Sequence, residues 1–321
     1  MREIPITDME NVRIGQVDDV PGGTGCTVFL FDGGAPAGLS VAGGGPASRE
    51  SELLKPTAAA QAIHAVVLSG GSAFGLDTAG GVMQYLEERG IGFDVGVTRV
   101  PLVCQSALFD LTVADCFARP DREMGYAACV ASEHGGNYRD GNHGVGTGCT
   151  VGKHRMMPCC MKSGIGSYAV QIGELKVGAV VAVNALGDVY DHKTGQMVAG
   201  MRTQDGRHLD NTCRALYENY EVVENRFVHN TSLGVVLTNG RFQKTQLCKI
   251  AAMTHDGYAR AIRPLHTTAD GDSIYAVSVG EVSADQDMVG TLAADVMAEA
   301  ILRAVQNAES AYGYPALRDM P

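Results

Sequence analysis

The apolar residues of this chain occur in short runs bounded by glycine, and this pattern limits the possible folds more than any other feature. The runs Cys26–Asp32, Gly38–Gly45 and Ala65–Leu68 have the length and the composition that are typical of strands. The 41 glycines among 321 residues are spread over many clusters without a period, which indicates tight turns and close backbone approaches rather than a low-complexity chain. We predict that the first two runs are paired strands.

Helical segments alternate with these strands. After Ala65–Leu68, a turn at Ser69–Gly71 leads into a predicted helix that ends near Gly90. Apolar spacing predicts two more helices, within residues 244–262 and 283–309, and Ser283 is the expected cap of the second. The expected buried stripe of that helix is Val289, Leu292, Val296 and Ala300, and further strands are expected within 176–191, 232–240 and 273–281. This alternation indicates a layered α/β or α+β architecture.

Charge and composition exclude several classes of function. The formal net charge is −11 and no basic run exceeds two residues, so no nucleic-acid partner is expected. No window reaches the roughly 18 apolar residues of a membrane span, and residues 1–12 lack an apolar signal core. The nine cysteines are an odd number in a chain of this length, so we expect reduced thiols and a cytoplasmic location.

Three local motifs carry no function on their own. "GTGCTVGK" (Gly146–Lys153) is not a phosphate-binding loop, because residue 147 is Thr and residue 154 is His. "SGGSAFG" (Ser69–Gly75) has the context of an anion site at a helix start, but a tight turn needed for packing explains it better. Cys159–Cys160 lacks the spacing of a zinc site, so neither a metal nor a cofactor is expected.

A polar triplet, Asn230–Thr231–Ser232, stands at the head of an apolar run. It fits a turn before a strand, or a threonine that becomes a nucleophile when the peptide bond before it breaks. The triplet also has the form of a glycosylation sequon, but the lack of an apolar signal core in residues 1–12 argues against glycosylation of Asn230. A free α-amine at Thr231 would have a pKa near 7.7–8 and could take the proton of its own hydroxyl. Asp270 and Asp272 flank Gly271, where they fit either an ordinary polar turn or the partners of such an amine.

Several longer segments, in order along nearly the whole chain, resemble one known family. They are "VLSGGSAFGLDTAGGVMQYLEERGIGF", "VPLVCQSALFDL", "GVGTGCTVGK", "KSGIGS", "VGAVVAVNALGDV", "NTSLGVVLTN" and "HDGYARAIRPLHTTADGDSIYAVSVGE". Together they are similar to the self-cleaving D-aminopeptidase/β-peptidyl aminopeptidase family, also called the L-aminopeptidase/D-esterase type, which includes nylon-oligomer hydrolases. The resemblance implies an αββα sandwich, related to that of ornithine acetyltransferase, formed by one catalytic domain over residues 1–321.

The resemblance also implies self-cleavage between Asn230 and Thr231, into residues 1–230 and 231–321. Thr231 would be the nucleophile, although Ser232 beside it is an alternative that strand register disfavours. Asp270 and Asp272 match the family's acidic pair. The remaining site residues implied by the resemblance are Asn184, as an oxyanion donor, and Lys153, near the nucleophile.

The resemblance leaves a difference at one position and three possible activities. Relatives can use a tyrosine hydroxyl as a second oxyanion donor where this chain has Phe109; Phe109 and Ser72 are expected to line the substrate pocket. The leading hypothesis is an amide hydrolase for small peptides or amino-acid amides and esters, which assembles as a tetramer or larger oligomer. The alternatives are an acyltransferase related to ornithine acetyltransferase and an uncleaved binding protein.

Overall fold

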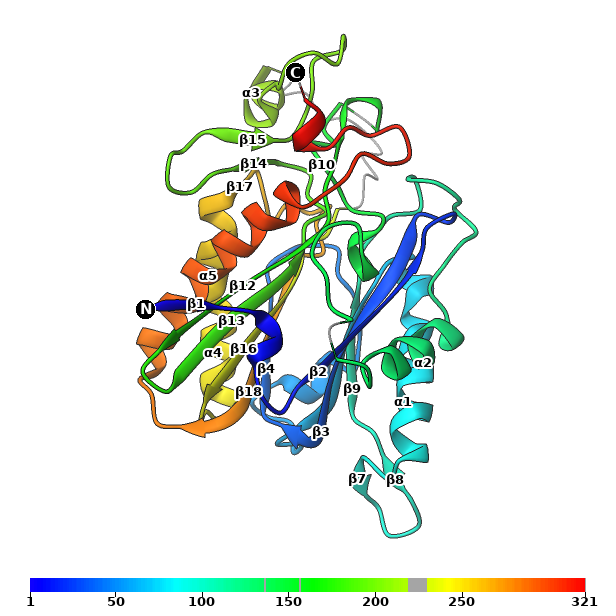
Figure 1. Ribbon diagram of the computed structural model, residues 1–321, viewed down its shortest axis with the longest axis vertical. Coiled ribbons are helices and arrows are strands. Elements are labelled where there is room, and N and C mark those ends of the chain that lie inside the picture. The colour runs from blue at the N-terminus through cyan, green and yellow to red at the C-terminus, as the bar shows by residue number, and fades with distance from the viewer. Residues whose placement is uncertain (136, 156, 219–229, 321) are drawn as a thin grey trace.

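The computed structural model describes residues 1–135, 137–155, 157–218 and 230–320, and its main body has four layers (Figure 1). Two stacked sheets form the middle of the molecule, and a pair of helices covers the outer face of each sheet. The expected α+β layered fold, an αββα sandwich, is therefore confirmed.

One sheet has six strands and holds the strand that follows the polar triplet. Each strand pairs antiparallel with its neighbours except β16 and β18, which are parallel. In spatial order the strands are β1 (Arg2–Ile4), β12 (Ile165–Ile172), β13 (Leu175–Ala182), β16 (Leu233–Gly240), β18 (Ser273–Val282) and β4 (Ala37–Val41).

The other sheet has five strands and also contains one parallel pair, β6 and β9. In spatial order its strands are β2 (Arg13–Asp19), β3 (Thr24–Ala35), β6 (Ile63–Ser69), β9 (Val103–Ala107) and β5 (Ala47–Arg49). In each sheet a helix connects the two parallel strands, because a parallel connection must return along the sheet. This helix is α4 (Lys244–Ala261) between β16 and β18, and α1 (Thr78–Glu88) between β6 and β9.

The helices lie where their apolar faces can be buried. α4 (Lys244–Ala261) and α5 (Gln286–Gln306) pack together on the six-stranded sheet, whereas α1 (Thr78–Glu88) and α2 (Arg122–Ala131) pack on the five-stranded sheet. In α5 the four residues of the expected stripe are all buried. Each fully buried Val or Leu side chain stabilises the fold by roughly 1.5–3 kcal/mol, which is how such a stripe fixes the helix on the sheet.

Smaller elements surround this sandwich. α3 (Thr212–Glu218) and a three-stranded sheet lie at one end of it, beyond the starts of β16 and β18 (Figure 1). The short strands are β7 (Phe93–Asp94) with β8 (Arg99–Val100), β10 (Thr150–Val151) with β11 (Met161–Lys162), and β15 (Met197–Ala199), β14 (Asp188–Tyr190) and β17 (Ile262–Arg263) in spatial order.

Two local predictions from the sequence are wrong. The runs Cys26–Asp32 and Gly38–Gly45 are not paired, because the chain passes from β3 in one sheet to β4 in the other. Ser283 is also not the cap of α5: the helix begins after Asp285, whose carboxylate accepts the N–H of Met288. In contrast, β6, the end of α1 just before Gly90, β16 and β18 agree with the sequence patterns.

Within the described ranges, no helix is long and apolar enough to cross a membrane. In the same ranges, no group of three or more His, Cys, Asp or Glu side chains is arranged to hold a metal ion. All nine cysteines lie in described segments, and each is a free thiol.

Candidate active site

The predicted cleavage bond lies at the edge of the six-stranded sheet where β16 and β18 begin. Because these strands are parallel, the chain segments that precede them meet at the same edge. Asn230 accordingly forms a parallel bridge with Asp270. The triplet 230–232 and the turn 267–272 therefore lie side by side, although 40 residues separate Ser232 from Asp272.

The peptide between Asn230 and Thr231 is held on both sides. The Asn230 carbonyl oxygen accepts a hydrogen bond from the Gly271 N–H at 2.8 Å and another from the Thr231 hydroxyl. The Thr231 N–H donates to the main-chain oxygen of Asn184 at 2.9 Å. The hydroxyl thus lies against the carbonyl that it is predicted to attack, while the Gly271 N–H polarises that carbonyl.

Glycine is required at position 271 because of the Thr231 hydroxyl. A Cβ added at Gly271 would lie 2.6 Å from Thr231 Oγ1 and 3.0 Å from the main-chain oxygen of Gly45. Any larger residue would displace the hydroxyl or the loop that follows β4. The glycine therefore lets the backbone N–H approach the Asn230 carbonyl closely.

Asn184 and Lys153 form a buried pair beside Thr231. Lys153 Nζ donates to Asn184 Oδ1 at 2.5 Å and to its main-chain oxygen at 3.3 Å. The Thr150 N–H also donates to Asn184 Oδ1, at 3.2 Å, and Asn184 Nδ2 donates to the Phe109 carbonyl at 2.9 Å. These contacts fix the orientation of the amide, and one of its two N–H bonds is already engaged.

Burial lowers the pKa of Lys153 to about 8, since the charged ammonium loses its hydration. Nearby acidic groups, including Cys160, Cys149 and Asp270, oppose this effect only in part. The lowered pKa makes the neutral amine of Lys153 easier to form than that of an exposed lysine. Lys153 is held by the same Asn184 carbonyl oxygen that accepts the Thr231 N–H.

The two aspartates of the turn have different partners. Asp270 Oδ2 accepts the N–H and the hydroxyl of Thr267, each at 2.7 Å, and burial together with Asp272 raises the pKa of Asp270 to about 6. Asp272 Oδ1 accepts the Ser232 N–H at 2.7 Å, and its Oδ2 accepts His266 Nδ1 at 2.8 Å. Asp272 therefore anchors the residue after Thr231, and Asp270 shapes the turn.

The two expected pocket residues lie in neighbouring segments. Ser72 has a left-handed backbone (φ 54°), and its N–H donates to the Leu108 carbonyl at 2.8 Å. Phe109, the next residue, is half-buried and gives its carbonyl to Asn184. Phe109 is thus connected to the site through its main-chain carbonyl. Ser72 lies close to Phe109, because it is hydrogen-bonded to Leu108, the residue before Phe109.

Ser232 faces the opposite side of the sheet from Thr231. Side chains alternate along an extended chain, and Leu233 and Val235 belong to the core between the sheets, whereas Val236 belongs to the core beneath α4 and α5. The Ser232 hydroxyl is buried and has no hydrogen-bond partner among the described residues. Thr231 and Asn184 therefore share one side, and Ser232 lies on the other.

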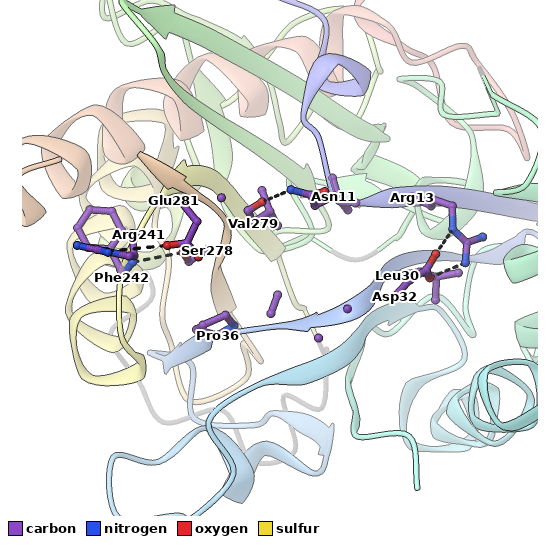
Figure 2. A pocket seen from close by; sticks show the side chains of 15 residues that line it. Asn11, Arg13, Leu30, Asp32, Pro36, Arg241, Phe242, Ser278, Val279 and Glu281 are labelled. Carbon is purple, nitrogen blue, oxygen red and sulfur yellow. Dashed lines mark hydrogen bonds and ion pairs between the residues drawn. The ribbon is translucent and has the colours of Figure 1, made fainter. Parts of the chain in front are cut away.

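A cleft of about 440 Å³ lies at the other end of β16 (Figure 2). Its lining includes Asn11, Pro36 and Arg241, the last of which directly follows the strand. β16 has 8 residues, so at about 3.3 Å per residue its ends lie roughly 26 Å apart. This cleft is therefore separate from the surroundings of Thr231.

A sequence model of peptidase family S58 matches residues 5–317. The chain belongs to peptidase family S58. It is 34% identical over 349 aligned residues to an uncharacterized aminopeptidase of Mycobacterium tuberculosis (strain ATCC 25618 / H37Rv), with 98% of this chain and 97% of the relative covered. It is 26% identical to the 6-aminohexanoate-oligomer endohydrolase of Kocuria sp. (strain KY2), with 95% and 87% covered. The family resemblance is thus confirmed, and the S58 chain is placed among the hydrolases.

Solved structures share the fold of this S58 chain at low identity. The L-aminopeptidase D-Ala-esterase/amidase of Ochrobactrum anthropi, described as a new variant of the Ntn hydrolase fold, superposes with a TM-score of 0.68 at 18% identity, covering 94% of this chain and 86% of that one. The β-aminopeptidase of Burkholderia sp. gives a TM-score of 0.66 at 18% identity, with 97% and 90% covered. The S58 chain therefore has this variant of the N-terminal-nucleophile hydrolase fold.

Sequence reasoning on this S58 chain missed two residues of the site, Gly271 and His266. Gly271 acts through its backbone N–H, which no sequence pattern reveals. His266 lies six residues before Asp272, and this short spacing in a turn was the one signal that could have connected them. The five predicted residues Thr231, Asn184, Lys153, Asp270 and Asp272 do lie in one neighbourhood.

Proposed function

We propose that this S58 chain is a self-processing threonine amide hydrolase that acts on small peptides or on amino-acid amides and esters. The observation that carries the proposal is the pair of hydrogen bonds to the Asn230 carbonyl oxygen, from the Thr231 hydroxyl and from the Gly271 N–H. A nucleophile and an electrophilic donor on one peptide carbonyl are the two parts that acyl transfer requires.

Self-cleavage would begin with attack of Thr231 Oγ1 on the Asn230 carbonyl carbon. The hydroxyl proton is transferred to the Thr231 nitrogen, and the tetrahedral intermediate then expels this nitrogen, so that the acyl group passes from nitrogen to oxygen and the α-amine becomes free. Water hydrolyses the resulting ester, which leaves a carboxylate on Asn230 and restores the Thr231 hydroxyl. The Gly271 N–H would stabilise the oxyanion of both steps.

Turnover would use the same atoms. The α-amine of Thr231, with an ordinary pKa near 7.7–8, accepts the hydroxyl proton while Oγ1 attacks the substrate carbonyl. The leaving amine takes this proton from the α-ammonium group of Thr231, and water then hydrolyses the acyl ester. The free N–H of the Asn184 amide and the Gly271 N–H are the proposed oxyanion donors, and the main-chain oxygen of Asn184, which accepts the Thr231 N–H in the intact chain, would orient the new amine.

The roles proposed for the charged residues follow from their contacts. Lys153 holds the Asn184 amide through Oδ1, and the Asp272 carboxylate holds the Ser232 N–H. Asp270 shapes the turn that presents the Gly271 N–H. No cofactor is needed, since one residue supplies both the nucleophile and the base.

We further propose one catalytic domain over residues 1–321 that stays assembled after cleavage into residues 1–230 and 231–321. The smaller fragment would carry β16 and β18, which pair with β13 and β4 of the larger one, so the six-stranded sheet needs both. We also propose a cytoplasmic location, consistent with the nine free cysteines, and assembly of cleaved protomers into a tetramer or larger oligomer.

The hydrolase proposal is tested with a panel of amino-acid amides, p-nitroanilides and dipeptides of α- and β-amino acids. Wild-type protein should release amine from at least one of them, and the Thr231→Ala variant should release none. Amide hydrolysis that persists in Thr231→Ala would contradict the mechanism. Product that forms only when an amine acceptor is added would instead identify an acyltransferase.

A further inference from the structure

A cluster of aromatic and imidazole rings lies beneath the candidate site, on the helix-facing side of β16. His255 and Tyr258 come from α4, and His266 comes from the turn that leads to β18. The His266 ring lies 4.7 Å from that of His255, edge to face, and stacks 6.1 Å from that of Tyr258. Tyr258 is fully buried, and a Cβ at Gly234 of β16 would lie 2.8 Å from its hydroxyl.

His266 is tied to Asp272 by two hydrogen bonds. Its main-chain N–H donates to Asp272 Oδ2 at 3.2 Å, and its Nδ1 lies 2.8 Å from the same oxygen. A carboxylate only accepts, so the proton of this contact belongs to Nδ1. The backbone of His266 is left-handed (φ 54°), a conformation that is costly for most residues and that persists only where contacts hold it.

Asp272 in turn restrains the backbone next to Thr231. While Oδ2 is held by His266, Oδ1 accepts the Ser232 N–H at 2.7 Å. Ser232 directly follows Thr231, so the carboxylate fixes the backbone that carries the Thr231 hydroxyl. No other described residue hydrogen-bonds to the Asp272 carboxylate.

We propose that His266 is a positioning residue: by holding the Asp272 carboxylate against the Ser232 N–H, it sets the place of the Thr231 hydroxyl for both self-cleavage and turnover. The inference rests on the proposed function, since it assigns His266 a part in that reaction. His266 acts through Asp272 and the backbone, so its loss should lower kcat and leave KM nearly unchanged.

Two substitutions test the role of the His266 side chain without straining its left-handed backbone. His266→Gly removes Nδ1 but tolerates the left-handed backbone, and His266→Asn keeps a side-chain N–H donor and also tolerates that backbone. Tyr258→Phe is the matched control, because it keeps the stacked ring and removes a hydroxyl that has no hydrogen-bond partner in the described chain. For each protein we would measure the rate of self-cleavage, and kcat and KM per cleaved protomer.

His266→Gly should lower kcat and the cleavage rate together by roughly 10- to 100-fold, the usual consequence of a nucleophile displaced by about 1 Å. His266→Asn should recover most of this loss, and Tyr258→Phe should match wild type. An unchanged kcat per cleaved protomer in His266→Gly, in an active wild-type background, would overturn this inference alone, even if the variant melted at a lower temperature. Wild-type protein that neither cleaves itself nor hydrolyses amides would overturn the proposed function, and this inference with it.

Discussion

Thr231 and Ser232 are adjacent hydroxyl residues, both almost fully buried, at 4% and 1% exposure, yet they lie in opposite surroundings. The Thr231 hydroxyl donates to the Asn230 carbonyl and lies on the side of Asn184, with Gly271 against it. The Ser232 hydroxyl faces the helices and has no hydrogen-bond partner in the part of the chain that the structure describes. The alternation of side chains along an extended chain, rather than hydroxyl chemistry, therefore distinguishes them.

The backbone of Ser232 nevertheless matters to the site. Its N–H is held by Asp272, and its carbonyl accepts the Ser273 N–H at 3.2 Å. The comparison teaches that, in the proposed mechanism, one residue supplies the reacting side chain while the next supplies the backbone anchor. Substitutions on the two sides should therefore differ in effect by orders of magnitude.

The largest effect is expected from Thr231→Ala. Loss of the only proposed nucleophile should abolish self-cleavage and reduce amide hydrolysis by about 1000-fold or more, to below detection. Cleavage is followed by mass spectrometry and hydrolysis by amine release. Thr231→Ser is the matched variant, since it keeps the hydroxyl and should retain measurable cleavage; an inactive Thr231→Ser with an intact fold would point to a further need for the Thr methyl group.

Asn184→Ala should have the next largest effect. It removes the proposed oxyanion N–H and also the group that holds Lys153 Nζ. The expected loss is about 100- to 1000-fold in kcat, as for other oxyanion donors. Asn184→Asp is the control variant of similar shape, because it keeps an oxygen that can accept from Lys153 and removes the amide N–H donor. If the Asn184→Asp variant were as active as wild type, the donor role would be excluded.

Gly271→Ala tests the close packing of the Gly271 backbone against the Thr231 hydroxyl. The added Cβ would begin 2.6 Å from Thr231 Oγ1, so the hydroxyl or the turn must move. A displacement of the hydroxyl by about 1 Å should lower kcat and the cleavage rate roughly 10- to 100-fold. Gly33→Ala is the control, since its Cβ would meet nothing within 4 Å; equal losses in the two variants would contradict the steric argument.

Acid should inactivate the enzyme through Asp270. Its pKa is raised to about 6 by burial and by Asp272, and the charged carboxylate accepts the two hydrogen bonds of Thr267 more strongly than the neutral acid does. Below about pH 6 the protonated acid loses part of this hold, so kcat should fall as pH decreases. Protonation of the Thr231 α-amine, with a pKa near 7.7–8, sets a first fall of kcat that every variant keeps. Asp270→Asn should remove only the further fall near pH 6, at a loss of about tenfold near pH 8, whereas Asp188→Asn, whose carboxyl pKa is also raised to about 6 but which holds Thr212, should retain it.

Ser232→Ala should have the smallest effect. Its hydroxyl hydrogen-bonds neither to the Asn230 carbonyl nor to any other group in the described ranges, and the N–H that binds Asp272 is kept. Activity should stay within about threefold of wild type, and the free energy of unfolding should be unchanged or raised by up to about 1 kcal/mol, since an unsatisfied buried hydroxyl is removed. Loss of cleavage in Ser232→Ala would reverse the assignment of the nucleophile.

The sequence was sufficient to predict elements whose signal is local. Apolar spacing predicted α4 and α5, and β-branched runs predicted β6, β16 and β18, because burial of one face dictates these patterns. The assignment of β3 and β4 to different sheets could not be predicted, since it depends on partners far along the chain.

The site was predicted to the same extent. Thr231 and Asp272 were identified as candidates from their motifs taken together with the family resemblance, since the motifs alone also fit an ordinary turn. The Gly271 N–H was not, because it becomes a donor to Asn230 only when β16 and β18 pair in parallel. His266 was also missed, because its role depends on a left-handed turn that brings Nδ1 to Asp272.

The central claim is that Thr231, held against the Asn230 carbonyl, cuts the chain. The most direct test is the intact mass of the purified protein under denaturing conditions, with Thr231→Ala measured alongside. The account predicts two fragments in wild type, residues 1–230 and a smaller one that begins at Thr231, and one intact chain in Thr231→Ala. A wild-type chain that stays whole on prolonged incubation, or a cut at any other bond, would contradict it.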